Sequence, residues 1–345
     1  MDRRLLYEFK SILKVSGMVG TSIIIIAGII GGVSFYLLAP SEVEESTPPE
    51  ELFPIKTEED LTVRVYFHEK DQVKEKNLED YLVGVVISEV PPNFNKEAIK
   101  AQAVVARSYT YSRLEKRGGP GCNNHENADI CTNPDHCQAH YSESEVNSIY
   151  GDKSEKYYNI VSNAVSETMG EIVTYNRKPI PEAPYHSTCG GTTETAGEVW
   201  QTDMPYLENV ECNYCNHSSH FESETTIPFE EIEQVMSREG VQVPVLADNP
   251  PDLTVTERSK IGRVKTVNLM GNEFSGRQIR QMFDLRSTDF DWETSGDSVS
   301  VTTRGFGHGV GLCQYGADGM GKAGYNYRDI IRQYFTEIEF GQISK

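Results

Sequence analysis

One glutamate stands out as a group that could do acid–base chemistry. Residues 77–88 carry apolar side chains at helical spacing, and Glu89 falls on the same stripe at its end. Burial of a carboxyl group disfavours its charged form and raises its pKa, which a general acid working near neutral pH requires. The spacing alone leaves two other interpretations open, in which Glu89 caps the next turn or pairs with Arg107.

A polar segment further along the chain is rich in metal-ligand side chains. Residues 122–140 hold three cysteines and three histidines, namely Cys122, His125, Cys131, His136, Cys137 and His140. Thiolate and imidazole are preferred zinc ligands, so this density favours zinc. A disulfide between Cys131 and Cys137 is the alternative in an oxidising compartment. The chain has seven cysteines, and an odd number leaves at least one unpaired or metal-bound.

Other cysteines and histidines allow weaker hypotheses. Cys212 and Cys215 have a chelate or disulfide spacing, with His217 nearby. The run from His125 to Asp129 starts like a zinc-peptidase motif, so a zinc amidase is the enzymatic runner-up. The run lacks the second histidine of that motif, which weakens this hypothesis. Cysteine peptidase pairs, Cys313 with His308 or Cys189 with His186, lack an identifiable third group to orient the histidine.

The surrounding pattern predicts an α+β fold in which helices border an active cleft. Residues 61–67 alternate as a strand does, and Asn77 and Asn95 are expected to cap two helices, ending near residues 88 and 116. Residues 313–322 and 327–336 also read as helices. Every second residue from Gly305 to Gly311 is glycine, which permits close backbone approach to a ligand or to another chain segment.

Composition and charge predict how the 345-residue chain is divided. The formal net charge of −20 argues against a nucleic-acid partner. Residues 15–41 contain no charged side chain and are long enough for a transmembrane anchor, with residues 1–14 as a cytoplasmic tail. Residues 42–60 are acidic and contain prolines, as expected of an extended stalk. Residues 61–345 are then an extracytoplasmic domain, with a Cys/His-rich insertion at 118–155.

Five sequence blocks carry a resemblance to a known family. The run EDYLVGVVISEVP (79–91), followed by EAIKAQAVVARSY (97–109), closely resembles the stage II sporulation protein D family. Three later blocks agree in the same order: HSTCGGTTE (186–194), FSGR (274–277) and RGFGHGVGLCQYGA (304–317). The resemblance covers about residues 61–340, and the expected membrane anchor fits it.

The resemblance implies a lytic transglycosylase that cuts peptidoglycan glycan strands during forespore engulfment. The enzyme would work at the septal or engulfing membrane, beside a cell-wall amidase and a polytopic membrane protein. Hydrolytic glycosidases usually use two carboxyl groups, whereas a lytic transglycosylase closes a 1,6-anhydro ring and uses no water, so one carboxyl group suffices. The family also resembles amidase-enhancer proteins, which keeps open a non-enzymatic glycan-binding module that stimulates an amidase.

The resemblance also assigns site residues. It makes Glu89 the catalytic acid and base. A zinc held by Cys131 and His136, with Cys137 as a further ligand, would be structural and not required for the chemistry. The expected substrate contacts are the polar and glycine positions of the family blocks, namely Gln102, Arg107, Tyr109, His186, Ser187, Gly190, Gly191, His308 and Gln314.

Overall fold

The computed structural model describes residues 53–56, 61–241 and 250–344, and residues 52–345 form one compact unit. None of the helices in these ranges has the length and apolar character needed to cross a bilayer. The predicted tail (1–14) and anchor (15–41) lie outside the described residues, as does most of the stalk. Residues 53–56 of that stalk form strand β1 (Phe53–Lys56), which pairs in parallel with β15 (Glu339–Ser344). The folded region therefore begins before residue 61, where composition placed it.

The N-terminal elements surround helix α3. Strand β2 (Thr62–Phe67) pairs with β3 (Gln72–Asn77) and β4 (Ile130–Cys131), and a 3-10 turn, η1 (His68–Lys70), joins the first two. Helix α2 (Leu78–Glu89) is followed by α3 (Lys96–Arg113). The segment continues through η2 (Glu115–Arg117), α4 (Glu143–Tyr150), η3 (Gly151–Lys153), α5 (Ser154–Glu167) and β5 (Glu171–Tyr175).

Both expected asparagine caps are present. The Asn77 side chain accepts from the N–H groups of Glu79 and Asp80, and the Asn95 side chain accepts from the N–H of Glu97. These bonds satisfy donors that the first turn of a helix leaves free, and so they fix where α2 and α3 begin. Helix α3 ends at Arg113, three residues earlier than the pattern predicted, because the chain tightens there into η2.

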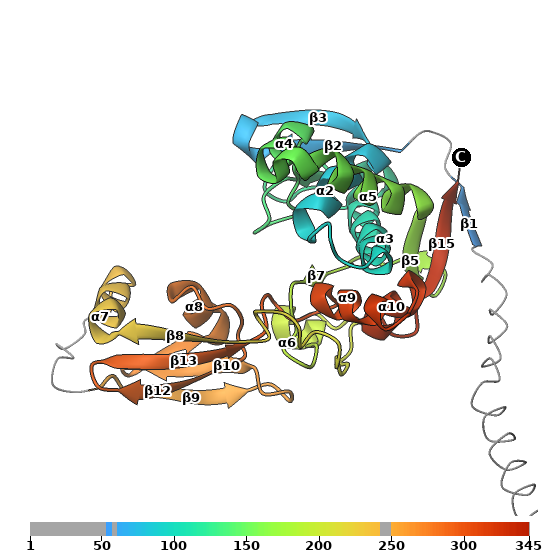
Figure 1. The fold of residues 1–345 in the computed structure, drawn as a ribbon. Helices are drawn as coiled ribbons and strands as arrows, with labels where there is room; N and C mark the ends of the chain where they lie inside the picture. Colours follow the sequence, from blue (N-terminus) through green and yellow to red (C-terminus); the bar gives the residue numbers. More distant parts are fainter. Residues whose placement is uncertain (1–52, 57–60, 242–249, 345) are drawn as a thin grey trace, which may run out of the picture. The chain divides into compact units, whose positions relative to one another are not determined.

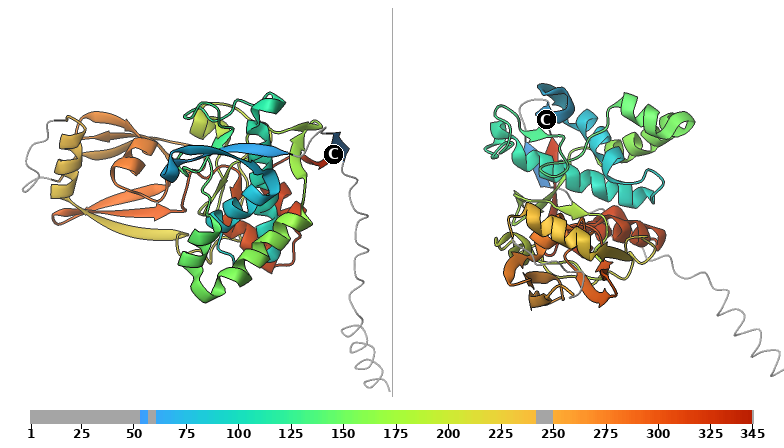
Figure 2. Two further views of the ribbon diagram at one scale, coloured as in Figure 1. Left: turned by 90° about the horizontal axis from the view of Figure 1, so that it is seen from above. Right: turned by 90° about the vertical axis from the view of Figure 1, so that its left-hand side faces the viewer.

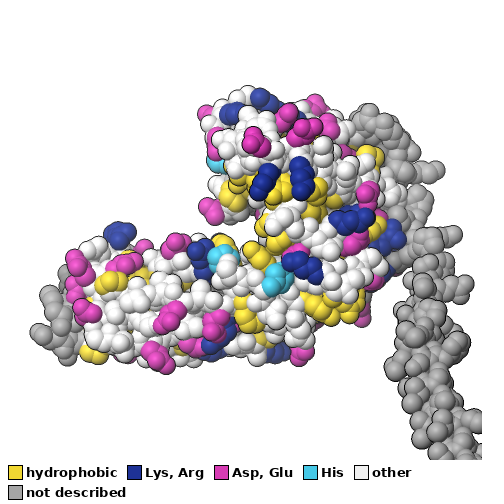
Figure 3. All heavy atoms as spheres, in the orientation of Figure 1, with side chains coloured by type: hydrophobic (Ala, Val, Ile, Leu, Met, Phe, Trp, Pro, Cys, Tyr) yellow, Lys and Arg dark blue, Asp and Glu magenta, His cyan; other side chains and the backbone are white. Residues whose placement is uncertain are grey.

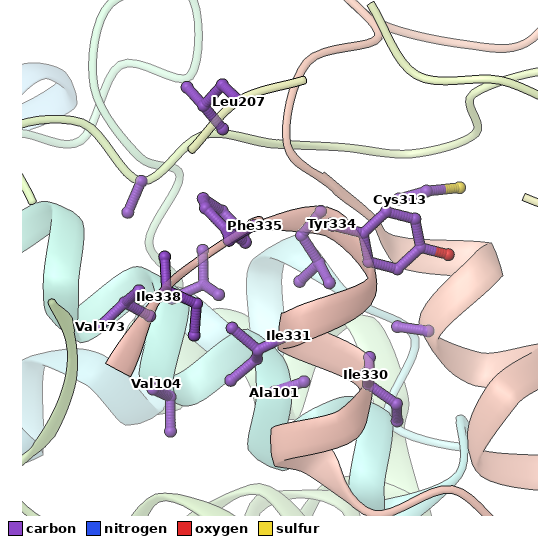
Figure 4. Close-up of a cluster of buried hydrophobic side chains, with 14 of the residues drawn as sticks. Ala101, Val104, Val173, Leu207, Cys313, Ile330, Ile331, Tyr334, Phe335 and Ile338 are labelled. Atoms are coloured by element: carbon purple, nitrogen blue, oxygen red, sulfur yellow. The ribbon is translucent and has the colours of Figure 1, made fainter. Parts of the chain in front are cut away.

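A second set of elements packs on the other side of α3 (Figures 1 and 2). It comprises β6 (Lys178–Pro179), β7 (Tyr185–His186), α6 (Ala196–Trp200), β14 (Leu312–Cys313), α9 (Gln314–Lys322) and α10 (Tyr327–Tyr334). Strand β15 returns to join β1, β5 and β6 in one sheet. Figure 4 shows the core between α3 and α10, where Val104 of α3 faces Ile331 of α10. Both C-terminal helices were predicted from sequence.

Residues 222–304 form a lobe with its own apolar core. The lobe consists of β8 (Glu222–Pro228), α7 (Phe229–Arg238), β9 (Leu253–Arg258), β10 (Val264–Leu269), β11 (Asn272–Ser275), α8 (Gly276–Met282), β12 (Phe290–Ser295) and β13 (Ser298–Arg304). It holds two three-stranded sheets, ordered β12-β13-β8 and β11-β10-β9. Val267, Phe290 and Val301 are wholly buried in its core.

The alternating glycines after β13 pack against the segment around β7. A Cβ at Gly307 would lie 2.8 Å from Cβ of His186, and one at Gly311 would lie 2.2 Å from the carbonyl oxygen of Pro184. Both glycines have positive φ, at 112° and 72°. Of the two alternatives that the glycine spacing left open, the structure therefore shows close approach to another chain segment.

Candidate active site

Glu89 is the last residue of α2, and its side chain is half-buried. The backbone N–H of Ala139 donates to Glu89 Oε1 over 2.9 Å, and the Tyr185 hydroxyl lies close enough to stabilise the charged carboxyl group. Burial raises the pKa of Glu89 from its ordinary value of 4.5 to about 7, although both groups act to lower it. The carboxyl group can therefore exist in either protonation state near neutral pH.

A relay of hydrogen bonds fixes the direction of the Tyr185 hydroxyl. Gln138 Nε2 donates to Tyr185 Oη over 3.0 Å, and Gln138 Oε1 lies 2.8 Å from the Thr110 hydroxyl. Because the tyrosine oxygen accepts from Gln138, its own proton is available to Glu89. Burial raises the pKa of Tyr185 well above its ordinary value, so the hydroxyl stays protonated.

Arg107 lies in the interior and makes a structural ion pair. Its guanidinium donates to both carboxylate oxygens of Glu79, over 2.9 and 2.7 Å, and to the carbonyls of Val165 and Glu171. The side chain has no exposed surface. Arg107 is therefore not placed to contact a substrate, and its carboxylate partner is Glu79 and not Glu89. The pair ties α2 and α3 to the end of α5 and the start of β5.

The other two residues expected on α3 differ in exposure. Gln102 is fully buried and accepts from Gln314 Nε2 over 3.3 Å, which joins α3 to the first turn of α9. Tyr109 is half-buried, with the Arg113 guanidinium 4.8 Å from its ring centre. Burial raises its pKa, and its hydroxyl lies within hydrogen-bonding reach of Cys137. Tyr109 therefore lies between the helices α2 and α3 and the cysteine-rich segment.

The two histidines of the family blocks lie side by side. The rings of His186 and His308 are 5.5 Å apart, and Trp200 lies 5.3 Å from His308. His308 Nδ1 accepts from the Val310 N–H over 3.1 Å, and the Tyr185 backbone lies near enough to act on the pKa of the ring. Burial lowers the pKa of His308 to about 4 and the pKa of His186 well below its ordinary value, so both rings are neutral. Tyr185 thus connects the histidines to Glu89.

Ser187, Gly190 and Gly191 serve the local chain path. The Ser187 carbonyl accepts from the Tyr315 N–H over 3.0 Å, and the Gly191 carbonyl accepts from the Cys212 N–H over 2.8 Å. Gly190 and Gly191 have positive φ values of 80° and 113°. The segment after β7 is therefore held between α9 and the loop that carries Cys212.

Four side chains of the insertion converge into what we call the mixed Cys/His cluster, formed by Cys122, Cys131, His136 and Cys137. Nδ1 of His136 lies 3.3 Å from the sulfurs of Cys131 and Cys137 and 3.6 Å from that of Cys122. All four ligand atoms lie within 4.8 Å of one another. His136 and Cys137 converge although they are adjacent in sequence, and Cys122 meets them and Cys131 at the same point.

The remaining cysteines and histidines have other partners. All seven cysteines are free thiols, and Cys189 and Cys313 converge with Cys212 and Cys215. His125 stacks on Tyr66 with ring centres 3.5 Å apart, outside the mixed cluster. His140 stacks on Tyr81. This arrangement does not favour the peptidase pairs or the zinc amidase, because His186 and His308 bond backbone groups of Val310 and His125 lies away from the other ligands.

The described surface has a hollow bordered by hydrophobic side chains, with histidine side chains nearby (Figure 3). A separate pocket of about 250 Å³ lies beside α2 and β3, lined in part by Lys70, Lys74, Lys76 and His140. Glu89 does not line that pocket.

Sequence reasoning did not identify Tyr185, Gln138, Trp200 or the role of Cys122. Tyr185 immediately precedes the HSTCGG block, and Gln138 immediately follows Cys137, so both border segments already of interest. Neither has a spacing that links it to Glu89, from which they lie 96 and 49 residues away along the chain. Only the folded chain shows the relay.

Comparisons with known proteins identify relatives of the whole described region. A family model described as "Stage II sporulation protein" matches residues 66–175, which include Glu89 and the mixed cluster. The chain is 33% identical over 289 residues to stage II sporulation protein D of Bacillus amyloliquefaciens, covering 84% of this chain and 81% of that protein. It is 34% identical over 282 residues to stage II sporulation protein D of Bacillus subtilis (strain 168), covering 82% and 79%. The amidase enhancer of Bacillus subtilis (strain 168) is 25% identical over 302 residues, covering 74% of this chain and 39% of that protein.

Proposed function

Because this chain belongs to the stage II sporulation protein D family, we propose that it is a peptidoglycan lytic transglycosylase acting in sporulation. The proposed reaction cleaves the β-1,4 bond between N-acetylmuramic acid and N-acetylglucosamine and leaves 1,6-anhydro ends. The preferred substrate would be glycan strands that an amidase has stripped of peptides. The observation that carries the proposal is the position of Glu89 at the end of α2, where its carboxyl group accepts from the Ala139 N–H and burial raises its pKa to about 7.

The proposed mechanism uses Glu89 twice. Protonated Glu89 gives its proton to the oxygen that leaves the muramic anomeric carbon, and the C–O bond breaks. The resulting carboxylate then takes the proton from the muramic C6 hydroxyl as that oxygen bonds the anomeric carbon and closes the anhydro ring. Glu89 ends protonated, so no water is consumed. A pKa near the working pH suits a residue that must be acid and then base.

The groups around Glu89 suit the charged form of Glu89 and the sugar substrate of the proposed reaction. The Ala139 N–H and the Tyr185 hydroxyl stabilise the carboxylate formed after the first proton transfer. The neutral His308 and the half-buried Trp200 beside it offer a polar edge and an aromatic face, which suit sugar hydroxyls and sugar rings. We assign these two side chains to the glycan-binding side of the site, where the buried His186 ring packs against His308.

The test is product analysis with a matched pair of variants. The full chain, purified in mild detergent, is incubated with peptide-free glycan strands, and the products are identified by mass spectrometry. Wild type and Glu155→Gln, which alters an exposed carboxylate on α5, should both yield anhydro-muramic ends. Glu89→Gln should bind strands and yield none. Ordinary reducing ends that appear with wild type and not with Glu89→Gln would mean that the protein is a hydrolase and not a transglycosylase.

A second candidate function is a non-enzymatic glycan-binding module that stimulates a cell-wall amidase. The similarity to a protein named amidase enhancer favours it. This module would leave glycan strands uncut, would increase peptide release by an added amidase, and would tolerate Glu89→Gln. The same two variants therefore separate the candidates when an amidase assay is run beside the glycan assay.

We further propose a structural zinc at the mixed Cys/His cluster. Three sulfurs and one imidazole nitrogen supply the number and type of ligands that a closed zinc site takes. Bound there, the metal would tie β4 to the segment that leads to Ala139, and it would not take part in proton transfer. A disulfide between Cys131 and Cys137 would leave Cys122 and His136 without a role as zinc ligands.

The cellular setting is proposed on the sequence and the family together. Residues 15–41 would anchor the chain in the septal or engulfing membrane of a sporulating bacterium, with the N-terminus in the cytoplasm. The expected partners are a cell-wall amidase and a polytopic membrane protein of the engulfment machinery. Protease protection in intact and permeabilised cells tests the orientation, since residues 61–345 should be accessible without permeabilising the cytoplasmic membrane.

A further inference from the structure

Four buried cysteines meet at one point beside the candidate site. Cys189 follows β7, Cys212 and Cys215 lie in the loop before β8, and Cys313 ends β14. All four are at most 1% exposed, and their sulfurs lie within 4.8 Å of one another. The sulfurs of Cys189 and Cys215 are 3.5 Å apart. We call these residues the four-cysteine cluster.

The spacing of the sulfurs suits a single ion. Thiolates placed tetrahedrally at about 2.3 Å from zinc lie roughly 3.8 Å from one another. A disulfide needs its sulfurs at about 2.05 Å, which would require the pair to move together. An iron–sulfur cluster places several irons between its cysteines and so spreads them further apart than one ion does. Cysteines acting only as small apolar side chains have no reason to converge four at a time.

Hydrogen-bond donors surround the sulfurs. The N–H groups of Cys189 and Gly316 each lie 3.3 Å from Cys313 Sγ, and the Tyr334 hydroxyl lies 3.2 Å from Cys212 Sγ. A Cβ at Gly316 would come within 2.6 Å of Cys212 Sγ, so the glycine allows this approach. Donors of this kind are typical of the outer shell around metal-bound thiolates.

A buried cation with two unpartnered nitrogens lies beside the cluster. Arg263 is 2% exposed, and its Nη2 donates to the Cys189 carbonyl over 2.9 Å. Its Nε and Nη1 have no hydrogen-bond partner among the described residues. The carboxylates of Glu194 and Asp289 lie near enough to act on it. A divalent ion with four thiolates carries two negative charges, which would offset such a buried guanidinium.

We propose that Cys189, Cys212, Cys215 and Cys313 bind a structural zinc ion, separate from the mixed Cys/His cluster. All four positions are protein ligands, so the site is closed and serves structure instead of catalysis. The ion joins three segments that are distant in sequence: the turn after β7, the loop at 212–215 and the start of α9. Those segments carry His186 and Gln314, so the metal would fix the wall of the candidate site opposite α2 and α3.

The test combines metal content with variants of each cluster in the full chain. Wild type purified without chelator should hold about two zinc ions per chain if both clusters are loaded. Cys212→Ser with Cys215→Ser should lose about one of them. The matched control, Cys122→Ser with Cys131→Ser, should lose the other and keep the four-cysteine ion. Equal zinc in wild type and the Cys212/Cys215 variant would overturn the proposal.

A second measurement tests the proposal if the Cys212/Cys215 variant fails to fold. The Cys122/Cys131 variant, loaded with Co²⁺ in place of zinc, should show the intense thiolate charge-transfer bands and tetrahedral ligand-field bands of four-sulfur coordination. Absence of those bands would contradict the site. The mass of the denatured, unreduced wild-type chain provides a further check. A mass about 4 Da below that of the fully reduced chain would contradict the site, because it means that two disulfides have formed among the cysteines.

Discussion

The backbone N–H of Ala139 donates to Oε1 of Glu89 over 2.9 Å, and Ala139 lies two residues after Cys137 of the mixed cluster. The segment that leaves the cluster therefore supplies a backbone hydrogen bond to the candidate catalytic carboxyl group. Gln138, which lies between Cys137 and Ala139, donates to Tyr185, whose hydroxyl lowers the pKa of Glu89. The ligand cluster and the acid–base residue are thus coupled through three consecutive positions of the chain.

Removal of metal from the mixed cluster should weaken glycan cleavage without abolishing it. His136→Ala removes the nitrogen ligand and loosens the segment that carries Gln138 and Ala139. We expect cleavage to fall roughly 10- to 100-fold, the usual cost of disturbing groups that orient a site. The control is His125→Ala, which removes a ring stacked outside the cluster. Unchanged cleavage by a His136→Ala chain that has lost its zinc would argue against the coupling.

Glu89→Gln should stabilise the fold at high pH. Folding raises the pKa of Glu89 from 4.5 to about 7, so the folded chain binds the proton more tightly than the unfolded chain. The stability that the fold gains from this tighter proton binding is fully present below about pH 4.5 and is lost as the pH rises through about 7. Glutamine carries no charge and can keep the bond from Ala139. Relative to wild type, the variant should gain about 1 to 3 kcal/mol between pH 4.5 and pH 8.5.

Urea denaturation of both chains at the two pH values measures this difference. Glu155→Gln is the control, because that exposed carboxylate should show little change in relative stability across the same range. A constant difference between Glu89→Gln and wild type would mean that the folded chain does not raise the pKa of Glu89.

Tyr185→Phe should move the pH dependence of cleavage upward. The Tyr185 hydroxyl lowers the pKa of Glu89, so its loss raises that pKa further. Because cleavage starts from protonated Glu89, kcat/KM in wild type should fall above about pH 7, and in the variant this fall should begin at a higher pH. Tyr206→Phe is the control, since Tyr206 bonds the Glu182 carbonyl. A fall at the wild-type pH in Tyr185→Phe would show that the hydroxyl does not act on Glu89.

Arg107→Met should destabilise the fold strongly. The substitution leaves Glu79 and two buried carbonyl groups without their donor, and breaking such a pair costs about 3 to 5 kcal/mol. Adding Glu79→Gln to the same chain should recover part of the loss, because the uncompensated charge is removed. The exposed Arg238→Met provides the control. If Arg107→Met had normal stability and bound glycan more weakly, we would instead infer that Arg107 contacts the substrate.

The sequence by itself determined the local elements of the site. Asn77 and Asn95 identified the starts of α2 and α3, because a capping side chain acts within three residues. Helical spacing placed Glu89 on an apolar stripe, and the density of cysteines and histidines marked residues 122–140 as a metal-binding segment, within which the family resemblance selected Cys131, His136 and Cys137. The predicted anchor and most of the stalk lie outside the described residues, so they stay predictions.

Only the tertiary structure decided which distant residues meet. It gave Arg107 to Glu79, brought Tyr185 to Glu89, and gathered Cys189 and Cys313 with the Cys212 pair. Arg107 could not be distinguished from a substrate ligand by its type, since the same guanidinium binds a carboxylate or a sugar. Periodicity reports contacts within one element, whereas these contacts join segments from 28 to 124 positions apart, and packing of the separate cores brings them together.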